Sequence, residues 1–363
     1  MVYNVIGIMS GSSLDGLDIA FVELTEVRGK WEYEIRVAEC LAYEPEWVAQ
    51  LSGATALPAM EYLLLHSRYG HYTGQKVNEF IAKHQLDHQV HFIASHGHTT
   101  FHVPAEKMTA QLGEGAAIAA VTGLPVISDL RAMDVALGGQ GAPIVPVGEQ
   151  LLLPGYAYYL NLGGIANISA REGDDFIAFD ICPANRVLNA LAAELGREYD
   201  ENGALAAGGL TDKALLEALN ALPYYEMPWP KSLANEFGTG TVLPLVQRSR
   251  LSVQGRLNTY TNHIAVQVAK TVEKLQQGQV PQEEQQMLIT GGGAFNGFMI
   301  QQLEAQLRPL NVKVVVPDEQ TVKYKEALIM ALIGALRWRQ EPNVLSSVTG
   351  AQKDSVGGAL WQS

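Results

Sequence analysis

Two stretches of the chain each predict three consecutive short strands, and this repeated plan limits the possible folds more than any other feature. In the first stretch, apolar runs at 5–9 and 19–24 predict two strands, and strict alternation over Trp31–Val37 predicts a third strand with one buried face. The second stretch repeats the plan at 158–162, 165–170 and 176–180. Two halves of similar plan in tandem indicate a duplicated fold.

Helices and strands alternate after each stretch. The first stretch is followed by an expected helix over about 58–84, a strand at 91–95, a helix over 116–121 and a strand at 125–128. The second is followed by helices over 188–195 and 264–275, a strand at 287–290, a helix over 299–307 and a strand at 312–316. This alternation predicts an α/β fold whose halves divide in the loop-rich range 129–146, with ligands bound in a cleft between them.

Composition excludes several classes of protein. Hydrophobic residues make up 47% of the 363 residues, enough for a large core, and 25 Lys and Arg against 38 Asp and Glu give a formal net charge of −13. Such an acidic chain has no broad attraction for nucleic acid or an anionic membrane. Its longest apolar run, Ala327–Leu336, is about half the ~20 residues of a membrane-spanning helix. With no signal-peptide pattern and only two cysteines, we expect a cytoplasmic protein without nucleic-acid or membrane partners.

Three glycine-rich turns, each after a short apolar strand, are the strongest indication of function. They comprise Gly11, Ser12, Ser13, Leu14, Asp15, Gly16, Leu17 and Asp18; Gly163 and Gly164; and Gly291, Gly292 and Gly293. Glycine lets backbone N–H groups approach an anion closely, so the turns suit the phosphates of a nucleotide. A structural hairpin turn is the alternative for any one of them. The chain contains neither a Gly-x4-Gly-Lys-Ser/Thr sequence nor a helix-opening Gly-x-Gly-x-x-Gly, which excludes a P-loop and a dinucleotide fold.

Three aspartates are placed for chemistry. Asp15 and Asp18 lie in the first turn, where carboxylates beside phosphates are unfavourable unless Mg²⁺ lies between them. Asp180 ends a predicted strand just before a predicted helix. It suits a general base in the cleft, and the alternative is a cap for that helix.

The other candidates are histidines and one Asp–Arg pair. His96, His98 and His102 suit a zinc site, because His-x-His on a strand places both imidazoles on one face, but a polar sugar-contacting loop accounts for the same residues. Arg131 can hold a substrate by its fork of donors, with Asp129 beside it, and a surface ion pair is the alternative.

Taken together, a series of segments resembles the anhydro-N-acetylmuramic acid kinase family. They occur in the order of that family and cover almost the whole chain. The segments are IMSGSSLDGLD at 8–18, SHGHT at 95–99, GGQGAP at 138–143, NLGGIAN at 161–167, FD at 179–180, KS at 231–232, GGGAFN at 291–296 and VTGA at 348–351.

The resemblance implies a fold and a reaction. The fold is that of sugar kinases, heat-shock chaperone ATPases and actin, with two lobes of duplicated ribonuclease-H-like topology around an inter-lobe cleft. The lobes would span 1–135 and 136–363, with the C-terminal tail able to pack back on the first. In the reaction, ATP and water convert 1,6-anhydro-N-acetylmuramic acid to N-acetylmuramic acid 6-phosphate and ADP during recycling of cell-wall sugars.

Residue roles carry over by position. The glycine turns Gly11 to Asp18 and Gly163-Gly164 would hold the phosphates of ATP, and Gly291 to Gly293 would lie on the adenosine side. Asp180 matches the catalytic base, and Asp15 would position Mg²⁺ directly or through water. The sugar would contact His96, Asp129, Arg131 and Glu326. The sequence does not reveal the oligomeric state, and a homodimer is considered because dimers are the commonest soluble oligomers.

The loop after Asp180 departs from the family pattern. Many family members read Phe-Asp-Thr-Gly-Pro-Gly-Asn where this chain has Ile181, Cys182 and Ala184 in place of Thr and both glycines, and Glu149 stands where His is frequent. The new Cβ atoms are expected to narrow the space beside the anomeric carbon, and Cys182 to be a small buried residue. Three other functions remain as alternatives to the anhydro-N-acetylmuramic acid kinase. They are a kinase for another 1,6-anhydrosugar such as levoglucosan, a non-catalytic sugar or nucleotide sensor, and a metal-dependent hydrolase.

Overall fold

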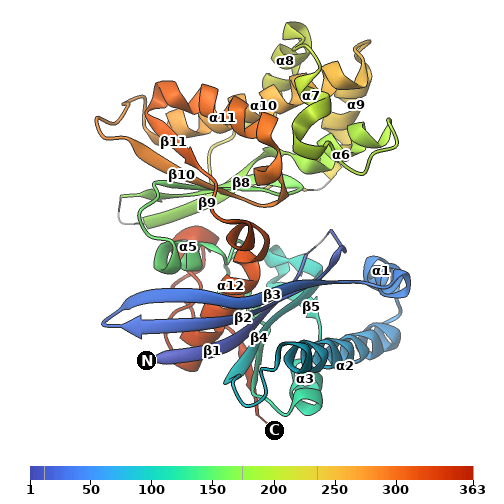
Figure 1. The fold of residues 1–363 in the computed structure, drawn as a ribbon, viewed down its shortest axis with the longest axis vertical. Coiled ribbons are helices and arrows are strands. Elements are labelled where there is room, and N and C mark those ends of the chain that lie inside the picture. The colour runs from blue at the N-terminus through green and yellow to red at the C-terminus, as the bar shows by residue number, and fades with distance from the viewer. Residues whose placement is uncertain (12, 174, 235, 363) are drawn as a thin grey trace. The chain divides into compact units, whose positions relative to one another are not determined.

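The computed structural model of the chain describes all residues except 12, 174, 235 and 363, and it contains two compact units. Unit 1 comprises Met1–Pro154 and Tyr324–Ser363, and unit 2 comprises Gly155–Lys323 (Figure 1). The C-terminal segment therefore packs in the same unit as the N-terminus.

A mixed sheet forms the centre of unit 1. Its strand order is β12-β6-β4-β1-β2-β3, and β5 pairs with the outer part of β4. The strands are β1 (Val2–Ser10), β2 (Gly16–Val27), β3 (Lys30–Ala42), β4 (Phe92–Val103), β5 (Met108–Leu112), β6 (Val126–Ser128) and β12 (Ala359–Trp361). The first three form the predicted antiparallel meander, and β4 then pairs parallel with β1 and with β6.

Helices cover both faces of this sheet. On one face, α2 (Ala59–His84) and α3 (Gly115–Thr122) bury Leu65 and Ile118 against Ile6 and Ile8 of β1. On the other face lies α12 (Glu319–Trp338), whose backbone approaches Gly7 so closely that no Cβ fits there. The shorter helices are α1 (Pro45–Ser52), α4 (Ala132–Ala136), α5 (Pro146–Leu152) and α13 (Ser346–Thr349).

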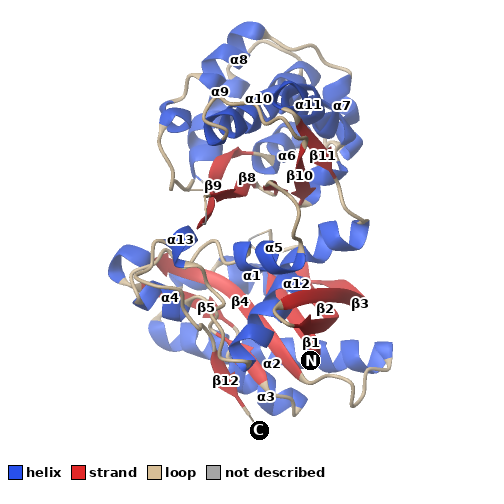
Figure 2. Ribbon diagram, turned by 90° about the vertical axis from the view of Figure 1, so that its left-hand side faces the viewer, coloured by secondary structure: helices blue, strands red, loops and turns tan. Residues whose placement is uncertain are grey.

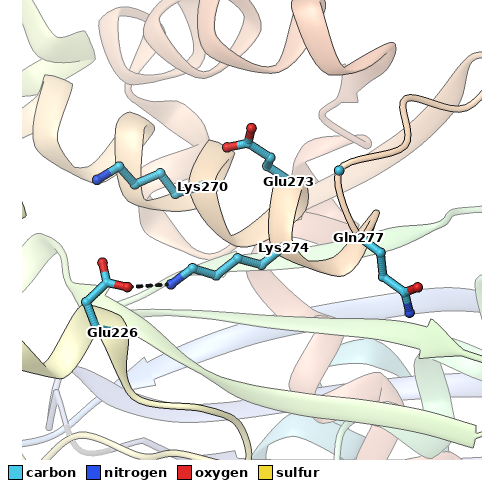
Figure 3. Close-up of a pocket in the computed structure, with 6 residues that line it drawn as sticks. Glu226, Lys270, Glu273, Lys274 and Gln277 are labelled. Carbon is cyan, nitrogen blue, oxygen red and sulfur yellow. Dashed lines mark hydrogen bonds and ion pairs between the residues drawn. The ribbon is translucent and has the colours of Figure 1, made fainter.

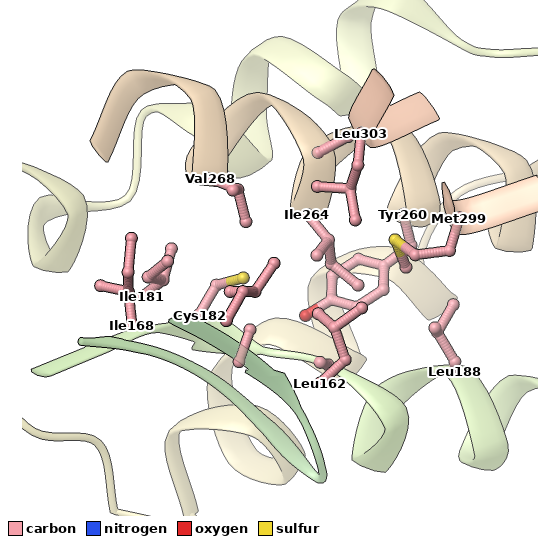
Figure 4. Packing of buried hydrophobic residues seen from close by; sticks show 14 of the residues in the cluster. Leu162, Ile168, Ile181, Cys182, Leu188, Tyr260, Ile264, Val268, Met299 and Leu303 are labelled. Atoms are coloured by element: carbon pink, nitrogen blue, oxygen red, sulfur yellow. The ribbon is translucent and has the colours of Figure 1, made fainter. Parts of the chain in front are cut away.

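Unit 2 also has a mixed sheet at its centre, but its helices cover one face of that sheet (Figure 2). The strand order is β11-β10-β7-β8-β9. The strands are β7 (Tyr158–Leu162), β8 (Ile165–Glu172), β9 (Asp175–Pro183), β10 (Gln285–Thr290) and β11 (Val312–Val315). The helices are α6 (Asn185–Ala193), α7 (Ala204–Ala207), α8 (Lys213–Asn220), α9 (Leu243–Gln247), α10 (Val253–Leu275) and α11 (Gly297–Leu307). Their apolar faces meet the sheet in a core that includes Leu162, Ile168, Ile264 and Leu303 (Figure 4).

The two sheets have the same topology. In unit 1 the order β3-β2-β1-β4-β6, and in unit 2 the order β9-β8-β7-β10-β11, place an antiparallel meander beside two parallel strands that follow later in the chain. This is the ribonuclease-H-like order, and it occurs twice. The predicted duplicated α/β fold is therefore confirmed.

One local expectation differs from the structure. The range 91–95 is only the start of β4, which continues to Val103 and pairs with β5, so the histidine-rich segment is a strand and not a loop. The apolar run Ala327–Leu336 lies in α12 and is buried in unit 1. Within the part of the chain that the structure describes, no helix has the length and apolar character needed to cross a membrane.

Candidate active site

A row of polar residues crosses the sheet of unit 2. Strand register pairs Thr290 with Asn161, Asn161 with Asn167, and Asn167 with Asp180. Directly paired residues project from the same face of a sheet. The neighbours Leu162 and Ile181 belong to the helix-covered core, so the polar row lies on the opposite face. Asp180 thus shares one row of the sheet with the residues that lead into two of the glycine turns.

Those two turns pack directly against each other. The turn at Gly163-Gly164 follows β7 and the turn at Gly291–Gly293 follows β10, its parallel neighbour. A Cβ on Gly291 would lie 2.5 Å from Asn161 Oδ1 and 2.9 Å from the Leu162 carbonyl oxygen, and Gly291 has a φ of +80°. Glycine is required here both by the backbone conformation and by the approach of the neighbouring turn.

Replacing Gly291 with Ala is therefore expected to destabilise unit 2 by about 1–3 kcal/mol, because it adds a close contact to a strained φ. Because a chain of two units need not unfold in one step, hydrogen exchange followed by mass spectrometry on peptides of β7 and β10 measures the loss. Gly292→Ala is the matched control, since the nearest atom to a Cβ there is Asn185 Nδ2 at 3.8 Å. Equal stability of the two variants would contradict this account of the turn.

Asp180 is held by a segment that follows α8. The Leu233 N–H donates to Asp180 Oδ2 at 2.8 Å, the Asp180 N–H donates to the Lys231 carbonyl at 3.2 Å, and the Tyr224 hydroxyl donates to the Asp180 carbonyl at 2.8 Å. Burial raises the pKa of the Asp180 carboxyl, and the Leu233 N–H partly offsets this. One carboxylate oxygen is fixed, and the hydrogen bonds of the described residues leave the other available to accept a proton.

The alternative role for Asp180 as a helix cap is wrong. The N-cap position of α6 is Ala184, and β9 does not end at Asp180 but continues to Pro183. The strand stays paired with β8 through an irregularity, because Asn167 pairs with Asp180 whereas Ala166 pairs with Cys182.

This β-bulge decides where the unusual side chains point. It inserts Ile181 as an extra residue, so that Cys182 turns into the core with Val268 and Ile264 instead of sharing the face of Asp180 (Figure 4). Cys182 and Ala184 are buried, and burial raises the pKa of the Cys182 thiol. Cys182 is thus the predicted small buried residue, but the Cβ atoms at 182 and 184 pack in the core and do not narrow the space beside Asp180.

The first glycine turn lies in unit 1 between β1 and β2. Ser12 lies outside the described residues, and the Ser13 hydroxyl donates to Asp15 Oδ1 at 2.7 Å. Leu14 takes a left-handed φ of 58°, and Gly11, Gly16 and Leu17 complete the turn and the start of β2. Burial raises the pKa of Asp18 to about 6, and the charges of Asp15 and Glu326 add smaller increases. A hydrogen bond from Cys40 lowers this pKa and offsets part of the rise. Asp15 and Glu326 are thus close enough to Asp18 for their charges to act on it.

Arg131 is held in place by His96. Arg131 Nε donates to His96 Nε2 at 2.7 Å, Arg131 Nη1 donates to the Gly141 carbonyl at 2.5 Å, and the geometry then assigns the His96 Nδ1–H as donor to the Gly97 carbonyl at 2.8 Å. Burial, with the Arg131 charge, lowers the pKa of His96 to about 3, so the ring is neutral. Both ring nitrogens are occupied, which favours His96 as a positioning residue for Arg131 over a direct sugar contact.

Glu326 lies near the Arg131 guanidinium. Burial raises the pKa of Glu326, whereas the charges of Lys325 and Arg131 lower it; burial lowers the pKa of Arg131 to about 10, whereas Glu326 raises it. Asp129 has a φ of 57° and accepts from the Ser128 hydroxyl at 2.7 Å. Among the described residues, no ion pair joins Asp129 to Arg131, so the surface-pair alternative has no support.

The other histidines have separate partners. His98 Nδ1 lies 3.1 Å from the Ser10 hydroxyl, and His102 Nδ1 lies 3.0 Å from the Thr109 hydroxyl. The described part of the chain holds no group of three or more His, Cys, Asp or Glu side chains that could bind a metal. The predicted residues therefore form two sets, one in each unit: His96, Asp129, Arg131, Glu326 and the turn at 11–18 in unit 1; Asp180, Gly163, Gly164 and Gly291 to Gly293 in unit 2.

Sequence reasoning missed several residues of these sets. Lys325, next to Glu326 in the chain, was not singled out, and its buried ion pair with Glu149, 2.7 Å long, was not predicted. The Leu233 amide, Asn161, Asn167 and Thr290 were not singled out, although Asn161 and Asn167 stand in the segment NLGGIAN. Strand pairing in the second meander is the signal that would have aligned these asparagines with Asp180.

A shallow hollow of about 380 Å³ on unit 2 contains none of these residues. It is lined by Glu226, Lys270, Glu273, Lys274, Gln277 and Gly278, and Glu226 pairs with Lys274 at 3.2 Å (Figure 3). Its charges are of both signs, so it carries no indication of a particular ligand.

Known proteins resemble the chain over nearly its whole length. A family model described as anhydro-N-acetylmuramic acid kinase matches residues 3–363. Curated proteins with that name from Hydrogenovibrio crunogenus and Gloeobacter violaceus are each 33% identical; the first match covers 98% of this chain and 97% of the relative, and the second covers 95% of each. A solved structure of a ROK family glucokinase from Streptomyces griseus aligns with a TM-score of 0.42 and 13% sequence identity. The alignment covers 91% of this chain and 98% of the glucokinase chain. At that score the fold assignment rests on the strand order of the two sheets.

Proposed function

The chain belongs to the anhydro-N-acetylmuramic acid kinase family and is an ATP-dependent carbohydrate kinase, and from this premise we propose that Asp180 is the base that couples ring opening of the anhydrosugar to phosphorylation. The observation that carries the proposal is the setting of Asp180. It is a partly buried carboxylate with one oxygen held by the Leu233 amide, in the same row of the sheet as the residues that lead into the Gly163 and Gly291 turns.

The proposed reaction consists of two displacements that share the bridging oxygen, which is the leaving group at the anomeric carbon and the nucleophile at the γ-phosphorus. Asp180 takes a proton from water as the water oxygen attacks the anomeric carbon, and the bond from that carbon to O6 breaks. O6 leaves with the electron pair and attacks the γ-phosphorus of ATP, so that ADP departs. The proton on Asp180 is later lost to solvent, and the products are N-acetylmuramic acid 6-phosphate and ADP.

The glycine turns and the residues of unit 1 supply binding. We place the phosphates of ATP at the turns of 11–18 and 163–164, the adenosine side at 291–293, and the sugar at Arg131 and Glu326, with Asp129 beside them and His96 holding Arg131. The donor forks of Arg131 suit the polar groups of the sugar.

Mg²⁺ fits this arrangement through Asp15. The charges of Asp15 and Glu326 help to raise the pKa of Asp18, and the charge of Asp15 helps to raise that of Glu326, so negative charge gathers beside the first glycine turn. Since the described residues form no complete set of metal ligands, Asp15 would hold Mg²⁺ together with phosphate oxygens and water, as is usual for this ion. When bound, Mg²⁺ neutralises charge on the transferred phosphoryl group.

The setting of the enzyme follows from its charge and reaction. A formal net charge of −13 favours small-molecule partners over nucleic acid, and use of ATP favours a cytoplasmic location. A homodimer is proposed only from the frequency of dimers among soluble proteins.

The decisive test is product analysis in ¹⁸O-labelled water with ATP, Mg²⁺ and 1,6-anhydro-N-acetylmuramic acid. Mass spectrometry is expected to show a 6-phosphorylated sugar with ¹⁸O at the anomeric position. Unlabelled product incubated in the same water corrects for spontaneous exchange at that carbon. Absence of product despite measured ATP binding would contradict the proposal, and levoglucosan in a parallel reaction would then test the other anhydrosugar alternative.

A further inference from the structure

We propose that Arg186, near the start of α6, binds the anionic polyphosphate of ATP beside the second glycine turn. The inference deepens the proposed function, because it rests on the Gly163-Gly164 turn being a phosphate loop. It assigns a cation to that loop, which the sequence of the turn itself does not contain.

The Arg186 guanidinium lies against Gly164. Its Nε and Nη2 atoms are 3.7 Å from the position that a Cβ on Gly164 would occupy. The Arg186 N–H donates to the Gly164 carbonyl at 3.3 Å, which ties the residue to the same turn. The absence of a side chain at Gly164 therefore leaves room between the guanidinium and the turn backbone.

The guanidinium has no counter-ion among the described residues. Arg186 Nε is buried and makes no hydrogen bond, and no acidic side chain of the described residues forms an ion pair with Arg186. By contrast, Arg256 in the same unit donates from both terminal nitrogens to Glu194, at 3.1 and 2.6 Å. A partly buried cation without a partner is costly to the fold, so its retention beside a glycine turn indicates an anionic ligand.

A side chain is needed here because the helix end is already occupied. The N–H groups of Ala184 and Asn185 donate to the carbonyls of Gly164 and Gly163, at 2.8 and 3.0 Å. These amides are not available to a phosphate, which is the usual ligand of such a helix start. Arg186 instead offers a planar fork of N–H donors that matches phosphate oxygens.

The neighbouring turn favours phosphate over the carboxylate of the sugar. Gly292 lies close to Asn185, the residue before Arg186, with 3.8 Å between Asn185 Nδ2 and the position of a Cβ on Gly292. The start of α6 therefore contacts both glycine turns of unit 2, Gly164 through Arg186 and Gly292 through Asn185, and this is the pattern expected for a polyphosphate.

Calorimetric titration of the full chain with ATP, ADP, AMP and adenosine, in Mg²⁺ and without sugar, tests the inference. Arg186→Gln is expected to weaken ATP and ADP binding about 10- to 100-fold, in line with loss of charge-assisted hydrogen bonds. AMP should lose less, adenosine should be unaffected, and Arg186→Lys should keep part of the affinity. Arg248→Gln removes the same charge from an exposed position and should change none of these values.

Other outcomes would overturn it. An equal loss for all four ligands, together with a lower Tm, would give Arg186 a structural role only, and a loss of anhydrosugar binding alone would assign it to the sugar carboxylate. This test and the test of the proposed reaction can fail separately. If Arg186→Gln forms product normally and binds ATP with unchanged affinity, only the Arg186 inference is wrong. If the unmutated chain forms no product but Arg186→Gln still loses affinity selectively for ATP and ADP, only the proposed reaction is wrong.

Discussion

Replacing Asp180 with Asn should lower kcat for sugar phosphorylation by about 10²- to 10⁴-fold, the usual contribution of a general base. Asn has the same shape as Asp, and its amide oxygen can still accept the hydrogen bond from the Leu233 N–H. ATP affinity should therefore stay within about twofold, since the loss concerns the proton transfer and not the fold. An ADP-release assay measures kcat, and calorimetry measures binding. Asp175→Asn is the matched control, because Asp175 is an exposed carboxylate on the same strand.

The pH profile gives an independent check on the same residue. Burial raises the pKa of Asp180 above its ordinary value. The active form is deprotonated, so kcat/KM should fall as the pH is lowered through this raised pKa, and the inflection should lie above the ordinary aspartate value of ~3.9. The residual activity of Asp180→Asn should lack that limb. A variant that keeps both the rate and the limb would show that another group is the base.

The fold was predictable because its signals are local. Each signal is contained in a few consecutive residues. Examples are the alternation over Trp31–Val37 and the short apolar runs before the glycine turns, which mark strands of both meanders. The extension of β4 was not predictable in this way. His96 and His98 interrupt the apolar pattern, and they are buried only because Arg131 and Ser10, far along the chain, supply their hydrogen bonds.

The candidate site residues that local sequence could single out lie in turns or at predicted strand ends. Asp180 and the three glycine turns have that signature, whereas the amide that holds Asp180 belongs to Leu233, 53 residues away. The bulge at Ile181 is also a product of strand pairing, and it directs the Cβ atom of Cys182 into the core rather than toward the face of Asp180. Contacts of this kind depend on tertiary structure that the sequence around each residue does not encode.

The Glu149–Lys325 pair is a buried contact of this kind, with its partners 176 positions apart in the chain, and breaking it should cost more stability than any other change considered above. Lys325 Nζ donates to Glu149 Oε1 at 2.7 Å, and the two side chains are only 4% and 3% exposed. Glu149 Oε2 is buried without a partner. Lys325→Met would leave a buried carboxylate with no counter-charge, at a cost of about 3–5 kcal/mol.

Because a chain of two units need not unfold in one step, hydrogen exchange followed by mass spectrometry on peptides of α5 and α12 is the suitable measurement. Lys325→Met should increase exchange in both helices. The double variant Glu149→Gln, Lys325→Met should recover most of the protection, since it removes both charges. Lys323→Met is the control on the same helix, because its pair with Glu319 is exposed and worth about 0–1 kcal/mol. If Lys325→Met behaved like this control, the pair would not stabilise unit 1. If it lost protection and the double variant did not recover, packing of the lysine stem rather than its charge would hold α12 against α5.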